Sequence, residues 1–338
     1  MGKAAFKPVR VGVVGLGNFG RLHALTLAGL AEAELVALVA RRQASVDALS
    51  AELQAVSGHR VPGWTDLEQA IQEAAPEAAP EAWVVAASTA SHVPVARRLL
   101  AAGYPVLVEK PLAGSLAEAE SLAPLVRADS SNLMLGHILL FNSEFRQLQA
   151  EVRARSPMAY IHCARHRPAT TLARFPGESP FHLLMVHDLY SVLALVDRRE
   201  PVAFCAQTRH TSAGECDLTL AQLRWEDGLV ASFAASFLTP EGMPADGFDR
   251  MEVYGQGWAA RVEANPRPLT VWDEQARAPM TLEILADPIA PSGMLAEELR
   301  CFCRVVRGVQ PVPMGATYHD ALQVQRWLDR LERAAEAQ

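Results

Sequence analysis

Short apolar runs and amphipathic segments alternate over the first 140 residues. The apolar runs predict strands at 11–14, 35–39, 83–87, 106–108 and 133–138. The segments between them have apolar residues at helical spacing, which predicts helices at 18–31, 43–56, 66–74, 91–102 and 115–127. Strands that are apolar on both sides and alternate with helices are typical of a parallel sheet covered on both faces. We therefore expect an α/β domain of the Rossmann type.

The pattern changes after about residue 145. Alternating or β-forming segments predict strands at 159–167, 202–210, 218–225, 229–237 and 250–256. The segment WEDGLV has the composition of a hairpin turn between two of them. Helical patterns are expected at 183–196, 295–307 and 319–334. We predict a dinucleotide-binding domain at 1–143 and, at 144–338, an α+β domain with an open, mostly antiparallel sheet for substrate binding and oligomerisation.

Composition narrows the range of partners and compartments. The 338 residues have a formal net charge of −7, which argues against nucleic-acid binding. Five cysteines without framework spacing are typical of reduced thiols, so we expect a cytoplasmic protein. No apolar run is long enough to cross a membrane, so no membrane partner is expected. Cys301 and Cys303 point to different helix faces and are poor metal ligands, and no metal site is predicted.

A glycine-rich turn follows the first predicted strand and opens the first helix. Gly15, Gly17 and Gly20 form G-x-G-x-x-G in the context that dinucleotide binding requires. The first glycine allows a tight turn, the second lets a pyrophosphate approach, and the third lets the helix pack closely. The helix N-terminus offers free N–H groups to the phosphates. The predicted cofactor-binding residues of this turn are Gly15, Gly17, Asn18, Phe19 and Gly20.

The end of the second strand bears on the choice of cofactor. An NAD site usually has an acid about 20 residues beyond the glycines, but Ala40 stands there. Arg41 and Arg42 follow and could bind a 2′-phosphate, although both could simply be solvated residues at a helix start. The pattern favours NADP(H), and NAD(H) remains the alternative.

Three further motifs carry a family resemblance. They are ASTASH at 87–92, VEKP at 108–111 and GHILLFN at 136–142. With the glycine turn and the later His-Asp, they resemble the Gfo/Idh/MocA oxidoreductase family over the whole chain. The resemblance implies NAD(P)-dependent chemistry on a sugar, polyol or nucleotide-sugar. Within the family, the sequence is most similar to the branch acting on nucleotide-linked amino sugars. Beyond the glycine turn and the two arginines, the expected cofactor-binding residues are Ser88, His92, Glu109 and Lys110.

Lys110 is the first of two predicted catalytic residues. It follows an apolar strand directly and precedes Pro111, which restrains the backbone. Ligands of open α/β sheets bind outside the carboxyl ends of the strands. A lysine there can stabilise a developing alkoxide or share the proton that alcohol oxidation releases. The alternative is a surface lysine, but the resemblance implies that the lysine of Glu-Lys-Pro is catalytic.

His187 is the second predicted catalytic residue. The resemblance implies that the histidine of Asp-x-x-x-His-Asp is the general acid/base, and His187-Asp188 fit its last two positions. Leu183 stands where the upstream acid is expected. His182 lies five residues before His187, about 140° around an α-helix, so the two do not form a one-face zinc pair. The alternative is that His187 is a core histidine bonded to backbone.

Several polar residues have two interpretations each. His137 and Asn142 could bind substrate hydroxyls or cap the following helix, and His92 could cap its helix with Ser91 instead of contacting the cofactor. Arg165 and Arg167 share a strand face and could meet an anionic substrate, or could lie on a solvated sheet edge. The predicted substrate-binding residues are His137, Asn142, His182 and Asp188.

Together these patterns predict an NAD(P)-dependent dehydrogenase or reductase acting on CH–OH groups of a small molecule. One alternative is a lyase or glycosidase with a recycled nicotinamide, a chemistry implied by the family resemblance. Another is a non-catalytic cofactor-binding regulator, which Leu183 in place of the acid suggests. The exposed face of an antiparallel sheet favours a homo-oligomer, a dimer or tetramer.

Overall fold

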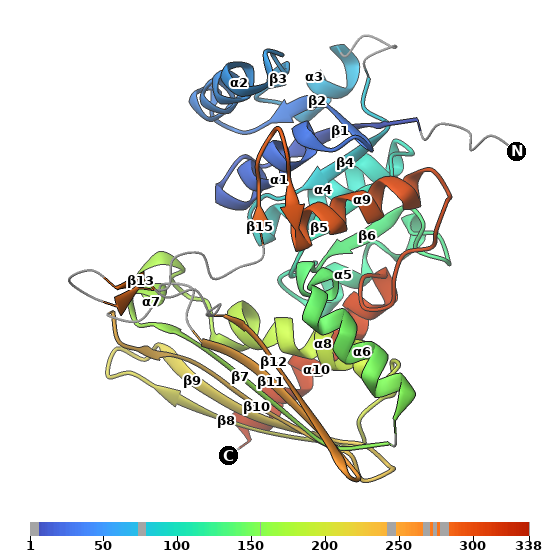
Figure 1. Cartoon of the computed structure of the whole chain (residues 1–338). Coiled ribbons are helices and arrows are strands. Elements are labelled where there is room, and N and C mark those ends of the chain that lie inside the picture. Colours follow the sequence, from blue (N-terminus) through green and yellow to red (C-terminus); the bar gives the residue numbers. More distant parts are fainter. Residues whose placement is uncertain are drawn as a thin grey trace, which may run out of the picture. The chain divides into compact units, whose positions relative to one another are not determined.

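The computed structural model describes residues 7–73, 79–155, 157–241, 248–265, 271–272, 276–277 and 284–337. The chain divides into two compact units (Figure 1). Unit 1 comprises Met1–Phe141 and Ile284–Leu322. Unit 2 comprises Asn142–Glu283 and Gln323–Gln338.

Unit 1 contains a six-stranded sheet in the order β3-β2-β1-β4-β5-β6, in which every neighbouring pair is parallel. This is the doubly wound arrangement that binds dinucleotides. The predicted Rossmann sheet is confirmed, and the short β3 was not predicted. The strands are β1 Val9–Val14, β2 Ala33–Val39, β3 Gly63–Trp64, β4 Ala82–Val85, β5 Val106–Glu109 and β6 Leu133–Gly136.

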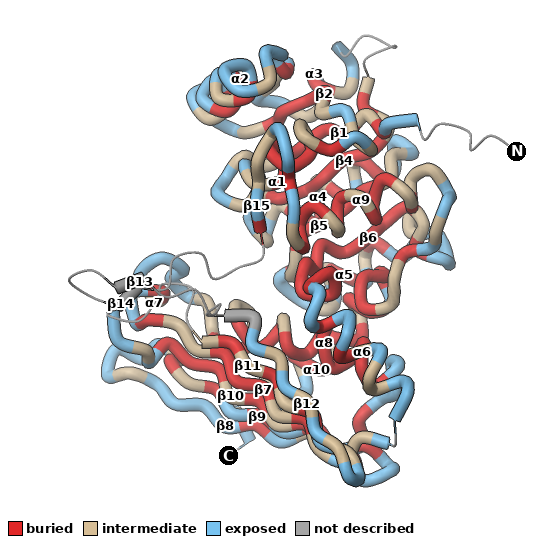
Figure 2. The backbone as a smooth tube through the Cα atoms, viewed as in Figure 1, coloured by how far each residue is buried: buried red, intermediate tan, exposed pale blue. Residues whose placement is uncertain are grey.

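Helices cover the sheet of unit 1. Those between the strands are α1 Asn18–Gly29, α2 Gln43–Ser57, α3 Leu67–Glu73, α4 Thr89–Ala101 and α5 Leu116–Glu120. The predicted helix at 115–127 ends early and continues as a 3₁₀ turn, Ala123–Leu125, because Pro124 lacks the N–H that an α-helix needs. Another 3₁₀ turn, η2 Ile138–Phe141, follows β6. The strands are buried almost throughout, as sheets covered on both faces require (Figure 2).

Residues 284–322 belong to unit 1, so a single boundary at residue 143 does not describe this chain. The segment contains the hairpin β15 Ile284–Leu285 and β16 Ser292–Gly293, then α9 Met294–Val306, which packs on α1 and η2. Arg307 forms a bidentate ion pair with Glu81, in which Nη1 donates to Oε1 at 2.9 Å and Nη2 donates to Oε2 at 2.8 Å. The apolar face of α9 and the Arg307–Glu81 ion pair hold this late segment against unit 1. Local sequence patterns do not show such long-range contacts.

Unit 2 contains a second six-stranded sheet, in the order β12-β11-β7-β10-β9-β8. Only the β7–β10 pair is parallel among these strands, so the predicted mostly antiparallel sheet is confirmed. The predicted hairpin closes with the Trp225 N–H donating to the Leu229 carbonyl, and Gly228 has φ 88°. The strand β12 was not predicted. The strands are β7 Met158–Pro168, β8 Ala203–His210, β9 Cys216–Arg224, β10 Val230–Thr239, β11 Phe248–Gly255 and β12 Trp258–Asn265, and the short pair β13 Val271–Trp272 and β14 Ala276–Arg277 lies apart.

One face of the second sheet is covered and the other is open. A π-helical turn, η3, contacts β7 and β10, and Trp327 packs edge-on against Trp225. On the opposite face, Leu220, Leu238 and Tyr254 are exposed. The helices of unit 2 are α6 Ser143–Ala154, α7 Thr170–Arg174, η3 Phe181–Met185, α8 Val186–Leu195 and the later part of α10 Tyr318–Glu336. Among the described residues, no helix is long and apolar enough to cross a membrane.

Candidate functional site

The glycine turn between β1 and α1 has the geometry that a dinucleotide needs. Gly15 has φ +91°, and a Cβ there would lie 2.6 Å from the Ala86 carbonyl oxygen. A Cβ on Gly20 would collide with the Gly15 carbonyl oxygen. A Cβ on Gly17 would meet no protein atom within 4 Å. Protein packing thus requires glycine at two positions and leaves the third facing open space.

The residues present fit a pyrophosphate at this turn. Gly17 is the N-cap of α1, and no side chain caps the helix. The first turn of α1 carries no acidic residue, so nothing there repels an anion. Free N–H groups at a helix N-terminus favour phosphate. Asn18 is exposed at this end, whereas the Phe19 ring packs edge-on against His23, with centroids 5.3 Å apart.

Arg41 and Arg42 lie just beyond the carboxyl end of β2, the strand beside β1. Both are exposed, and Arg42 is the N-cap of α2. Their position at the edge where the glycine turn lies is suitable for a 2′-phosphate. Their role in choosing NADP(H) stays a prediction.

Ser88 and His92 follow β4 at the same edge. Ser88 is the N-cap of α4, and its hydroxyl lies 3.0 Å from that of Ser91. His92 is buried, with its ring nitrogens 2.8 Å and 3.1 Å from the carbonyl oxygens of Pro111 and Ala87. This ring therefore joins the segment after β5 to the end of β4, and neither His92 nor Ser91 is the cap. Cofactor contact by Ser88 and His92 stays a prediction.

Glu109 and Lys110 end β5 in different environments. Glu109 is buried, and its Oε1 lies 2.8 Å from His23 Nε2. Its Oε2 accepts the backbone N–H of Lys110 at 3.3 Å. Lys110 itself is partly exposed, at the carboxyl edge that also carries the glycine turn. Cofactor binding by these two residues and catalysis by Lys110 stay predictions.

The two polar residues of the GHILLFN segment, His137 and Asn142, belong to different units. His137 is buried in unit 1, immediately before η2. Asn142 is buried in unit 2, and its Oδ1 accepts the Phe145 N–H at 2.9 Å as the N-cap of α6. The capping interpretation of Asn142 is therefore the one that the structure shows, and substrate binding by His137 and Asn142 stays a prediction.

His187 lies in the first turn of α8, directly after the π-helical turn η3. A π turn bonds residues five apart, so the angle of about 140° expected for an α-helix does not apply between His182 and His187. The His182 ring lies 2.7 Å from Glu332. Burial would lower the pKa of His182, but the hydrogen bond and charge of Glu332 raise it above its ordinary value. Catalysis by His187 and substrate binding by His182 stay predictions.

Asp188 belongs to a buried ion network in unit 2. Arg165 donates to both of its carboxylate oxygens, at 3.2 and 2.8 Å, and also to Asp249 at 2.7 Å. Arg167 pairs with Asp249 as well. Because β7 lies between β10 and β11, Arg165 and Arg167 are on a central strand, and the expected solvated sheet edge is wrong. Arg165 thus binds both oxygens of the Asp188 carboxylate. Substrate binding by Asp188 stays a prediction.

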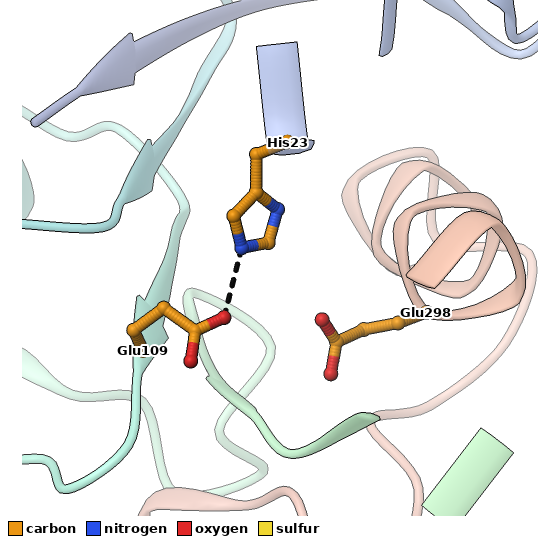
Figure 3. Close-up of side chains that lie close together, drawn as sticks. All are labelled: His23, Glu109 and Glu298. Atoms are coloured by element: carbon orange, nitrogen blue, oxygen red, sulfur yellow. Dashed lines mark hydrogen bonds and ion pairs between the residues drawn. The ribbon is translucent and has the colours of Figure 1, made fainter. Parts of the chain in front are cut away.

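Two buried residues near Lys110 were missed by the sequence reasoning. His23 on α1 and Glu298 on α9 lie beside Glu109 in the interior of unit 1 (Figure 3). The sequence does indicate that Glu298 is buried. It follows Leu295 by three residues and precedes Phe302 by four, which places it on the apolar face of its helix. An acid on such a face is buried and needs a partner.

Family models match most of the chain. The model described as "Oxidoreductase family, NAD-binding Rossmann fold" matches residues 9–137, and the "GFO/IDH/MocA C-terminal domain" matches residues 132–260. The chain belongs to the Gfo/Idh/MocA oxidoreductase family. The predicted family, fold class and nicotinamide-dependent dehydrogenase activity are thereby confirmed at family level.

Individual relatives agree with this membership. UDP-N-acetylglucosamine 3-dehydrogenase from Acidithiobacillus ferrooxidans is 27% identical over 324 residues, covering 90% of each chain. Inositol 2-dehydrogenase 1 from Saccharopolyspora erythraea is 33% identical over 184 residues, covering 53% of this chain and 52% of the relative. The structure of scyllo-inositol dehydrogenase from Lactobacillus casei, with NAD(H) and scyllo-inositol, superposes with a TM-score of 0.81 at 22% identity and 98% coverage of both chains. That likeness shows a shared fold.

Proposed function

We propose that this protein transfers a hydride between a nicotinamide dinucleotide and a secondary hydroxyl or carbonyl of a cyclic polyol or nucleotide-linked sugar. The observation that carries the proposal is the shared edge of the first sheet. Gly15 and Gly17 follow β1, Ser88 follows β4 and Lys110 follows β5, and these three strands are adjacent. A phosphate-binding turn and an amine at one carboxyl edge are what a dehydrogenase of this fold requires.

The protein's own groups then have separate tasks. The nicotinamide, when bound, supplies the acceptor or donor of the hydride. The glycine turn holds the pyrophosphate through backbone N–H groups of α1. Lys110 stabilises charge on the substrate oxygen and shares its proton, and His187 completes proton transfer as the general acid/base. The name of the relative that covers 90% of this chain supports a nucleotide-linked amino sugar as the first substrate to test.

NADP(H) is the proposed cofactor. Arg41 and Arg42 are exposed beyond β2, and Ala40 replaces the acid that would bind a 2′-hydroxyl. Two guanidinium groups suit a 2′-phosphate. Isothermal titration of NADPH and NADH compares the two directly, and tighter NADH binding contradicts the preference. So does unchanged NADPH binding in the variant combining Arg41→Ala and Arg42→Ala.

The test of the activity is turnover on a panel of inositols and UDP-linked sugars, followed through the absorbance of reduced nicotinamide. Lys110→Met keeps the side-chain length and removes the charge, so kcat should fall by about 10²–10⁴ while the cofactor Kd is kept. Lys7→Met is the matched control, because Lys7 is exposed. A folded Lys110→Met variant with normal turnover contradicts the role of Lys110.

The same panel distinguishes the alternatives. A lyase or glycosidase with recycled cofactor consumes substrate without a net change in nicotinamide absorbance, which product chromatography would reveal. Cofactor binding without turnover of any substrate would favour a regulator. The open face of the second sheet, with Leu220, Leu238 and Tyr254 exposed, supports a homo-oligomer, and light scattering gives its size.

A further inference from the structure

Three titratable side chains meet in the interior of unit 1. His23 and Glu298 are 0% exposed and Glu109 is 8% exposed. They come from α1, α9 and β5, and their side chains converge on one point (Figure 3). One polar atom from each lies within 4.8 Å of one from each of the others. We call these three residues the buried trio.

The contacts of Glu109 use both of its oxygens. Oε1 lies 2.8 Å from His23 Nε2, and Oε2 accepts the Lys110 backbone N–H at 3.3 Å. Gly136 on the neighbouring strand leaves room for this carboxylate, because a Cβ there would lie 2.8 Å from Oε1. The acid is therefore held at the end of β5, where it fixes the backbone from which the Lys110 amine extends.

Glu298 is the member of the trio without a side-chain partner. Neither of its buried oxygens has a hydrogen bond from a side chain among the described residues. A buried, unpaired carboxylate is costly and takes up a proton instead. Burial and then the negative charge of Glu109 raise the pKa of Glu298 well above its ordinary value, while the His137 backbone N–H opposes this.

The elements packed around Glu298 bring a histidine and a second acid to it. α9 contacts α1, η2 and the hairpin β15–β16. Among the described residues, the titratable side chains grouped with Glu298 are His23 from α1 and Glu109 from β5, and His137, before η2, contributes its backbone N–H. A neutral Glu298 carries one donor, and an ionised carboxylate has about four acceptor sites, so Glu109 can accept from Glu298 in addition to its present contacts.

A proton suits the trio better than a metal ion. Zinc holds nitrogen and oxygen ligands at about 2.0–2.2 Å, which separates neighbouring ligand atoms by more than about 3 Å. His23 and Glu109 instead lie at hydrogen-bonding distance, 2.8 Å, with no room for an ion between those atoms.

We propose that Glu298 is a positioning residue for Lys110: as a neutral carboxylic acid it donates a hydrogen bond to Glu109, which holds the end of β5. A neutral Glu298 removes one negative charge from the trio, which lies next to Lys110 in the chain through Glu109. A second charge would favour the protonated amine and hinder its exchange of protons with substrate. This inference rests on the proposed catalytic role of Lys110.

Infrared spectroscopy tests the protonation of Glu298 without reference to activity. At pH 8 the purified protein should show the carbonyl band of a protonated carboxylic acid. Glu298→Gln should remove the band, whereas Glu297→Gln, the matched control one residue away on α9, should leave it. Persistence of the band in Glu298→Gln, or stoichiometric metal in the purified protein, would overturn the proposal.

Kinetics test the positioning role. Glu298→Gln keeps a neutral donor, so kcat and its pH profile should stay near those of wild type. Glu298→Leu removes the donor and should lower kcat about tenfold, the rate equivalent of one hydrogen bond to a charged group, while KM changes little. The pH profile of kcat for Glu298→Leu should also shift relative to wild type. A purely structural role of Glu298 would not shift this profile in a folded variant.

The outcomes separate this inference from the proposed function. Equal losses in Glu298→Gln and Glu298→Leu, with normal thermal unfolding, would overturn the positioning role. If Glu298→Leu does not fold, Glu298→Gln still tests the proposal: it should lose the infrared band and keep the wild-type pH profile of kcat, and failure of either overturns the proposal. Normal turnover of Lys110→Met would refute the catalytic role of Lys110, on which this inference rests, and leave the infrared result standing, whereas absence of turnover on the whole panel by the wild type would contradict the proposed function.

Discussion

Replacing Gly17 by alanine should weaken cofactor binding and leave the fold intact. The residue has φ −71° and ψ −170°, an extended conformation that alanine adopts without strain. An added Cβ meets no protein atom within 4 Å. The remaining effect on folding is the exchange of glycine for alanine at a helix N-cap, which costs less than about 1 kcal/mol.

The effect on binding should be larger, because the Cβ enters the space proposed for the pyrophosphate. Overpacking a close contact costs about 1–3 kcal/mol, which corresponds to an increase of about 5- to 150-fold in the Kd. Gly15→Ala gives the contrast, since φ +91° and a contact of 2.6 Å to the Ala86 carbonyl oxygen both disfavour a side chain. That variant should lose about 2–5 kcal/mol of unfolding free energy.

The assay combines isothermal titration of NADPH and NADH with urea unfolding followed by tryptophan fluorescence. Gly114→Ala is the control, because a Cβ there would meet one atom at 3.6 Å, an ordinary van der Waals contact. It should change neither the Kd nor the unfolding free energy. A Gly17→Ala variant that binds both cofactors as wild type does would refute the placement of the pyrophosphate at this turn.

Three further outcomes are expected. Arg165→Met leaves buried aspartates without their partner and should lower the unfolding free energy by about 3–5 kcal/mol in urea titrations. The hydrogen bond from Arg307 lowers the pKa of Glu81 from its ordinary 4.5 to about 2; this pair therefore stabilises the fold fully above pH 4.5 and progressively less down to pH 2, and Arg307→Met should flatten that part of the stability profile. Leu183→Asp should change the ratio of kcat/KM between substrates more than the cofactor Kd; kinetics identical to wild type on every substrate would contradict a substrate-facing position.

The repeating order of strand and helix in the first sheet could be predicted because each element has a local pattern. Strands 106–108 and 133–138 are apolar runs, and the glycine turn has a fixed spacing. The return of residues 284–322 to unit 1 depends on contacts such as Arg307 with Glu81, which are 226 residues apart. No local pattern encodes which of many acids an arginine will meet.

The site was predicted less completely for a related reason. The position of the glycine turn follows from its spacing, and Lys110 from the end of its strand. The π-helical turn before His187 arises from backbone bonding over five residues, which residue spacing does not show. Asn142 could be a cap or a ligand by sequence, and only the Phe145 N–H at 2.9 Å shows that it caps α6.

Glu109 and Lys110 are adjacent charges that the alternation of side chains along a strand separates. Both Glu109 and Lys110 were predicted to bind the cofactor, although successive residues of a strand point to opposite faces. The structure directs the acid toward His23 in the interior and leaves the lysine partly exposed. A buried acid needs a partner, and a histidine on α1 provides it. The adjacent charges of Glu-Lys-Pro therefore lie in two environments: a partly exposed lysine at the sheet edge, and a buried acid that accepts the Lys110 backbone N–H.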